Sequence, residues 1–168
     1  KRILFSPIGG TDPIANYRDG AMLHICRKYK PDVVYLYLSK EMCETHELDN
    51  RYLYCMEKLE ELIKHKFEVQ VILKPELLEV QIFDSFFDEF SEILHNIATE
   101  YMDCEILVNV SSGTPAMKSS LQILSAFSEL NIIPIQVSTP GKKINKHEEN
   151  RKNYDVETLW ELNEDNVE

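Results

Sequence analysis

The sequence predicts an α/β fold: a Rossmann-like parallel sheet of about five strands with helices on both faces, followed by a C-terminal β-hairpin-like extension. Short apolar segments of strand length alternate along the chain with segments of helical periodicity. The segments at 33–38 and 106–110 are apolar at nearly every position, as expected of strands that are covered on both faces. Because strands joined through helices point the same way, the sheet should be parallel.

Length and composition describe one ordinary globular domain. The chain has 168 residues, of which 43% are hydrophobic and 28% are charged. Its formal net charge of −11 argues against binding to duplex DNA or to a membrane surface, but not against an anion held by backbone amides. No apolar segment is long enough to span a bilayer, so we expect a cytoplasmic protein. The four cysteines lack CxxC spacing, which indicates reduced thiols and predicts neither a metal nor a cofactor.

The first half of the chain predicts two strand-and-helix units. A strand at 2–5 is followed by a turn-rich loop at 6–13 and by a helix at 14–30. A second strand at 33–38 precedes a polar segment and then a helix that ends near residue 66. Four apolar side chains recur there at helical spacing: Tyr52, Met56, Leu59 and Ile63.

The second half continues the same alternation. After a strand at 68–73, a long helix carries a stripe of apolar and aromatic side chains, which are Phe83, Phe86, Phe87, Phe90, Leu94, Ile97 and Tyr101. A stripe at this spacing is typical of a core face and not of a base-stacking platform. A strand at 106–110, a helix from residue 114 and a strand at 132–137 complete the predicted sheet.

The turn between the fourth strand and its helix has the features of a helix start. Thr114 is a suitable N-cap, and Pro115 fits the first helical position because its missing N–H would have no helical partner. Gly113 allows the backbone to approach a ligand closely. Free N–H groups and the helix dipole would converge there on one spot, which favours an anion such as phosphate.

Neighbouring side chains add to this predicted anion site. Ser111 and Ser112 offer hydroxyls, and Lys118 could supply a positive charge one turn into the helix. Met117 directly precedes Lys118 in the same turn. Many α/β proteins cap such a helix and bind nothing there, so local chemistry leaves a ligand role and a structural role equally open.

The loop after the first strand has a similar composition. Gly9 and Gly10 permit close backbone approach, and Thr11 and Asp12 offer side-chain oxygens. A carboxylate would repel phosphate, so Asp12 is expected to bond backbone N–H groups, a ribose hydroxyl or a base edge. An Asx turn that only shapes the loop is an equal alternative.

A strand order of 3-2-1-4-5 would place these two loops together. The first and fourth strands would then be neighbours, and their loops would flank the point at which the strand order reverses, where ligands bind in open parallel sheets. Beyond residue 140 the composition changes. The segment 141–168 carries a local basic patch at 142–152 and predicts an extension or linker to a further domain that this chain lacks.

The two loops resemble a known family. Gly-Gly-Thr-Asp-Pro at 9–13 and Asn-Val-Ser-Ser-Gly-Thr-Pro-Ala-Met-Lys at 109–118 are similar to motifs of the CRISPR-associated Rossmann-fold (CARF) sensor domain. The likeness is greatest to the domain that begins the ancillary HEPN ribonuclease of type III-A CRISPR systems. It covers about residues 1–140, and the tail matches loosely.

The resemblance implies a homodimer whose two crevices join and bind one cyclic oligoadenylate. The residues it implies for ligand binding are Gly9, Gly10, Thr11, Asp12, Ser111, Ser112, Gly113, Thr114, Met117 and Lys118. Binding would activate a C-terminal HEPN endoribonuclease in antiviral defence. The ring size, cyclic hexa- or tetra-adenylate, is not determined by the sequence.

The resemblance also implies a slow, metal-independent ring nuclease activity in some members. A ribose 2′-OH would attack the adjacent phosphate, and Thr114 and Asn109 would position or stabilise the reacting groups. Two other readings remain open at this point: a small α/β enzyme that acts on a phosphorylated metabolite or nucleotide, and a dimerisation domain without a ligand.

Overall fold

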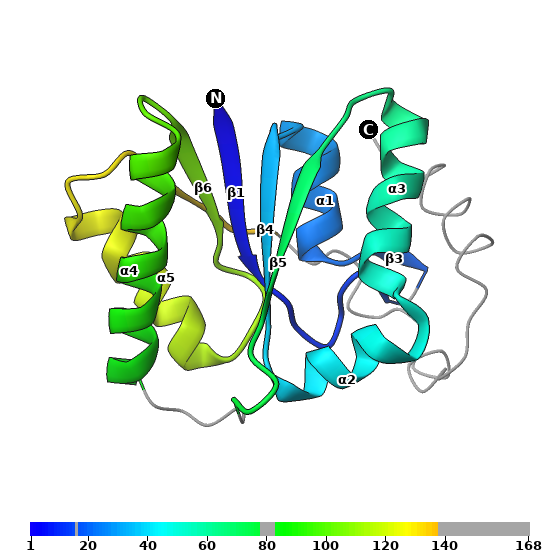
Figure 1. Cartoon of the computed structure of the whole chain (residues 1–168), viewed down its shortest axis with the longest axis horizontal. Helices are drawn as coiled ribbons and strands as arrows, with labels where there is room; N and C mark the ends of the chain where they lie inside the picture. The colour runs from blue at the N-terminus through cyan, green and yellow to red at the C-terminus, as the bar shows by residue number, and fades with distance from the viewer. Residues whose placement is uncertain (16, 78–82, 138–168) are drawn as a thin grey trace.

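A five-stranded parallel sheet in the order β5-β4-β1-β6-β7 forms the centre of the molecule (Figure 1). The computed structural model describes residues 1–15, 17–77 and 83–137. The strands are β1 (Arg2–Pro7), β4 (Val33–Leu38), β5 (Glu68–Leu73), β6 (Glu105–Asn109) and β7 (Ile132–Ile135). In order along the chain these are the first to fifth strands of the sheet, so the predicted order 3-2-1-4-5 is confirmed.

The central strand β1 shows why the sheet is covered on both faces. Leu4 pairs with Val34 of β4 and with Leu107 of β6, and its side chain packs into the core on one face. The next residue, Phe5, packs into the core on the other face. Because successive side chains of a strand point to opposite faces, an uninterrupted apolar strand fits only between two layers of helices.

Helices form those two layers. α1 (Ala21–Tyr29) and α3 (Arg51–Ile63) cover one face of the sheet, and α4 (Phe83–Glu100) and α5 (Pro115–Phe127) cover the other (Figure 1). On the second face, the ring of Phe90 meets those of Phe5 and Tyr37 at centroid distances of 5.2 and 5.0 Å. Among the described side chains of the predicted stripe, four are buried and two are partly buried against them, so this part of the stripe is core, as predicted. The buried ones are Phe86, Phe90, Leu94 and Ile97, and the partly buried ones are Phe87 and Tyr101.

The predicted helix at 14–30 is wrong over its first third. Residues there form the short antiparallel strands β2 (Ile14–Ala15) and β3 (Arg18–Asp19), and α1 begins at Ala21. Gly20 is the extended N-cap, and the Asp12 carboxylate accepts a hydrogen bond from the Met22 N–H at 3.1 Å. A capping carboxylate ten residues upstream leaves no local signal in the sequence.

A further helix, α2 (Lys40–Asp49), forms in the segment that the sequence described only as polar. Only Met42 and Cys43 of this helix are buried, so it has little apolar periodicity. Asn50, with φ of 55°, ends α2 and precedes α3 in the left-handed conformation that Asn tolerates.

Smaller differences occur at strand ends. β1 continues two residues beyond the predicted end, and β7 ends two residues before it. The extension at 141–168 lies outside the described residues. Within the described residues, none of the helices combines the length and apolar character needed to cross a bilayer.

Candidate functional site

The loops that follow β1 and β6 touch at the carboxyl edge of the sheet. A Cβ atom added to Gly9 would lie 2.9 Å from the backbone N of Gly113, so the two backbones are in direct contact. Gly113 has φ of +97°, which side chains rarely adopt, and a Cβ there would lie 2.9 Å from the Met117 sulfur. Gly9 is therefore required by the contact between the loops, and Gly113 by its own backbone conformation.

The N-terminus of α5 has the predicted cap. Thr114 has extended backbone angles, its Oγ1 accepts a hydrogen bond from the Met117 N–H at 3.3 Å, and Pro115 occupies the first turn. The first turn of α5 contains no acidic residue, so the positive end of the helix dipole is not neutralised locally. Lys118 follows in the next turn and is partly exposed.

Asn109 lies behind the second loop and is fully buried. Its amide nitrogen donates to the hydroxyls of Ser6 and Ser112 at 2.9 and 3.0 Å, and its carbonyl oxygen accepts from the Ser111 N–H at 2.8 Å. All the polar atoms of this side chain are thus used inside the protein. Asn109 shapes the loop and does not face the crevice.

Asp12 organises the first loop in the same way. One carboxylate oxygen accepts from the Gly9 N–H at 2.9 Å and the other from Met22, while the Ser112 hydroxyl also bonds the carboxylate. Burial raises the pKa of Asp12 above its ordinary value, and these hydrogen bonds act in the opposite direction. Of the partners considered for Asp12, the structure shows backbone N–H groups.

The predicted residues therefore divide into an exposed set and a supporting set. Gly10 and Thr11 are exposed, and Gly9, Ser111, Gly113 and Lys118 are partly exposed. Five others are buried behind the loops: Asp12, Asn109, Ser112, Thr114 and Met117. Met117 is 2% exposed and packs in the core beneath Gly113.

Ser6 belongs to the site although the sequence analysis did not select it. It is the last buried residue of β1 before Pro7, and its hydroxyl accepts from Asn109. A serine within an apolar strand is the only sequence signal for such a role, because its partner lies 103 residues away.

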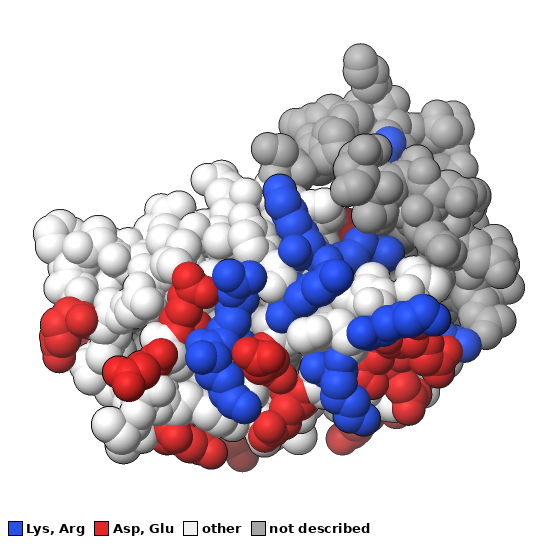
Figure 2. Space-filling model, turned by 90° about the horizontal axis from the view of Figure 1, so that it is seen from above, with Lys and Arg blue, Asp and Glu red and all other residues white. Residues whose placement is uncertain are grey.

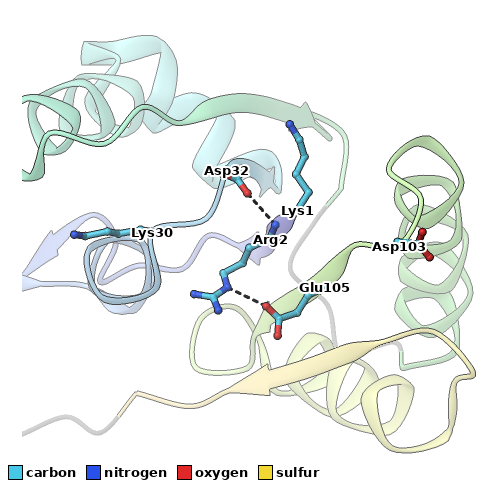
Figure 3. A pocket seen from close by; sticks show the side chains of 6 residues that line it. All are labelled: Lys1, Arg2, Lys30, Asp32, Asp103 and Glu105. Atoms are coloured by element: carbon cyan, nitrogen blue, oxygen red, sulfur yellow. Dashed lines mark hydrogen bonds and ion pairs between the residues drawn. The ribbon is translucent and has the colours of Figure 1, made fainter.

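A hollow of about 400 Å³ lies at the opposite, amino edge of the sheet, where Lys and Arg side chains gather among acidic ones (Figure 2). Arg2 bonds Glu105 at 2.9 Å (Figure 3). It also donates to the backbone carbonyl oxygen of Tyr29 at 2.8 Å. The guanidinium is thus already paired, and ligands of open parallel sheets bind at the other edge. We assign no ligand to this hollow.

An open parallel sheet has two glycine-containing loops at its switch point, and beside them lies a helix N-terminus without an acidic residue in its first turn. This arrangement defines a Rossmann-like domain of the class that binds ligands at the carboxyl edge of the sheet. Among the described residues, no three His, Cys, Asp or Glu side chains are close enough to hold a metal ion.

Comparison with known proteins identifies the family. The family model described as Cas_Csm6 CARF domain matches residues 68–168. The CRISPR system endoribonuclease Csm6 of Mycobacterium tuberculosis is 39% identical over 166 residues, which is 98% of this chain and 39% of that protein. Csm6′ of Streptococcus thermophilus is 32% identical over 168 residues, which is 98% of this chain and 41% of that protein.

A solved structure agrees with these matches. Enterococcus italicus Csm6, bound to cyclic hexa-2′-fluoro-hexa-dAMP, superposes with a TM-score of 0.72 at 34% identity, covering 83% of this chain and 34% of the other. The chain belongs to the CARF domain family of Csm6. It spans about two fifths of the length of the two curated relatives named above. The sequence matches extend into the tail beyond residue 140, which the motifs alone matched only loosely.

Proposed function

We propose that the chain is a sensor domain of type III CRISPR defence that binds a cyclic oligoadenylate at the carboxyl edge of its sheet. One observation carries the proposal. The loops of β1 and β6 meet beside the N-terminus of α5 in a fold shared with a Csm6 that was solved with a cyclic hexanucleotide analogue.

The exposed set of site residues is suited to phosphate and ribose. Within the described part of the chain, the amide N–H groups of Gly10, Thr11 and Gly113 take part in no hydrogen bond. Ser111 accepts a bond from the Val137 N–H at 2.7 Å, which leaves its own hydroxyl proton for a ligand oxygen. Lys118 adds the positive charge that a polyanionic ring requires.

The supporting set would act from behind. The side chains of Asp12 and Ser112 are 4% and 3% exposed and bond other protein groups, so they hold the loops in place instead of contacting phosphate directly. Met117 would support Gly113 in the same manner.

We infer a homodimer from the symmetry of the ligand. A ring of identical nucleotides has rotational symmetry, so two copies of this crevice related by a two-fold axis could each hold half of it. We also infer that the chain regulates an attached C-terminal HEPN endoribonuclease, because the relatives it matches are longer endoribonucleases. Its place of action would be the cytoplasm.

Slow ring cleavage is a further part of the proposal. The Thr114 hydroxyl lies at the positive end of α5, where charge that develops on a phosphate would be stabilised. Asn109 is fully buried and would act through the Ser111 N–H instead of touching the ring. No histidine lies in either loop, so a strong general base is absent there and the rate should be low.

Calorimetric titration tests the function. Cyclic hexa-adenylate and cyclic tetra-adenylate are compared with linear oligoadenylate and AMP, and the recovered ligand is analysed by chromatography. We expect tight binding of one ring per two chains. A linear product that ends in a 2′,3′-cyclic phosphate would establish cleavage, and an intact ring after long incubation with excess protein would refute it. Binding of AMP or a sugar phosphate but of neither ring would favour a metabolite enzyme instead.

A further inference from the structure

A row of buried hydrogen bonds runs beneath the crevice from β1 to the loop after β6. It begins at Ser6, which has no exposed surface. The Ser6 hydroxyl donates to the Pro7 carbonyl oxygen at 2.9 Å and accepts from the Asn109 amide at 2.9 Å. The Ser6 hydroxyl thus donates one hydrogen bond and accepts another.

The next member, Asn109, has only one orientation that satisfies its neighbours. Its nitrogen faces the hydroxyls of Ser6 and Ser112, and its oxygen faces the Ser111 N–H. If the oxygen and nitrogen of the Asn109 amide exchanged places, its NH₂ group would face the Ser111 N–H, and two donors would oppose each other without an acceptor. Because the Ser6 hydroxyl already donates to the backbone, it can only accept from Asn109, and this selects the orientation.

The row continues into the first loop. The Ser112 hydroxyl accepts from Asn109 and donates to Asp12, and the Asp12 carboxylate accepts from the Gly9 N–H. Ser112 belongs to the loop after β6, whereas Gly9 and Asp12 belong to the loop after β1. The row of hydrogen bonds therefore joins the two loops, in addition to the backbone contact between the two glycines.

We propose that Ser6 is a positioning residue for ligand binding, because its hydroxyl fixes the Asn109 amide that sets the second loop against the first. Ser6 does not reach the crevice, so its effect on a ligand passes through Ser111 and Ser112. The ligand in this statement rests on the proposed function, whereas the fixing of the loop can be measured without a ligand.

The binding experiment compares Ser6→Ala with Ser120→Ala. Ser120 is also fully buried, and its hydroxyl donates to the Ala116 carbonyl oxygen at 2.8 Å within α5, so both variants lose a buried hydroxyl. We expect Ser6→Ala to weaken binding of the cyclic oligoadenylate about tenfold, because Asn109 loses an acceptor, and Ser120→Ala to change it less than about twofold. Thermal unfolding of both variants shows whether the fold is retained.

A second pair of variants distinguishes positioning from general loss of stability. Asn109→Asp has nearly the same shape but cannot donate to Ser6 or Ser112. If the two residues act as one unit, the double variant with Ser6→Ala binds the ring little more weakly than Asn109→Asp alone. Fully additive losses would overturn the inference.

Hydrogen exchange of the ligand-free chain keeps the inference independent of the proposed function. Ser6→Ala should speed exchange of the Ser111 amide about tenfold, since that amide bonds Asn109, and Ser120→Ala should leave it unchanged. If the parent binds no ring, the proposed function fails while the exchange rates still decide the role of Ser6. If the parent binds the ring and Ser6→Ala changes neither affinity nor exchange, the role of Ser6 is refuted and the function stands.

Discussion

At the scale of single residues, the site separates a charge that would meet the ligand from charges that hold the protein together. Lys118 is partly exposed, and no ion pair of this residue occurs among the described residues. Lys118→Gln should weaken ring binding several-fold, reduce its dependence on salt and leave the melting temperature nearly unchanged. Lys66→Gln, at the amino edge of the sheet, serves as the control in the same titrations. Equal effects of the two variants would contradict a role for Lys118.

Thr114 caps α5, and the proposed function gives it a second role near the ligand. Thr114→Ala removes the acceptor for the Met117 N–H and should lower the free energy of unfolding by about 1 kcal/mol. It should also weaken ring binding, because the hydroxyl at the end of α5 is lost. Thr114→Ser keeps the cap and the hydroxyl, so denaturant titration and calorimetry should both find it close to the parent. Ring binding that is unaffected by Thr114→Ala would leave only the capping role.

The buried Asp12 predicts a specific pH dependence. Folding raises the pKa of the Asp12 carboxyl above 3.8, which is its ordinary value and applies in the unfolded chain. The folded chain therefore holds the carboxyl proton more tightly than the unfolded chain does. The contribution of Asp12 to stability therefore falls as pH rises above 3.8 and levels off above the folded pKa. Denaturant titrations between about pH 4 and 8 should show the parent losing stability relative to Asp12→Asn. If the parent instead gained stability relative to Asp12→Asn as the pH rose, this expectation would be contradicted. Asp88→Asn, on the exposed surface of α4, is the control.

At the scale of elements, one ion pair attaches the β2–β3 hairpin to α1. Arg27 bonds Asp19 through two nitrogens at 2.7 and 3.0 Å, and each side chain is 5% exposed. Removing one partner leaves a buried charge, so Arg27→Met should lower the free energy of unfolding by about 3 kcal/mol. Lys40→Met breaks an exposed pair with Glu44 and should leave the free energy of unfolding nearly unchanged in the same denaturant titration. Similar losses in the two variants would show that burial does not govern this pair.

The same elements show what could be predicted from the sequence. Short apolar segments located the five strands of the sheet, and the Thr-Pro pair located the cap of α5, because these signals are local. The hairpin at β2 and β3 could not be found in this way, since Arg27 of α1 stabilises it from outside the segment. In the site, the loops were located correctly. Which of their residues are buried depends on Ser6 and Asn109, which are brought together by strand pairing.

At the scale of the whole molecule, the cysteines report on opening of the core beneath α1 and α3. Cys26, Cys43 and Cys55 are buried on the same face of the sheet, whereas Cys104 is partly exposed. Burial raises the pKa of Cys26, and it raises that of Cys55 to about 12, so these thiols have little thiolate at neutral pH. Alkylation followed by mass spectrometry should label Cys104 first and the others only at the rate of unfolding. Early labelling of Cys55 would indicate that this core opens locally. The Cys104→Ser variant is the control, because the rapidly labelled thiol should be missing from it.

The bond between the Ser111 hydroxyl and the Val137 N–H links the loop after β6 to the backbone two residues beyond β7. A ligand that draws the Ser111 hydroxyl towards itself must pull on that amide or give up one hydrogen bond. Under the proposed function, a ligand that binds at Ser111 would therefore act directly on the backbone just beyond β7.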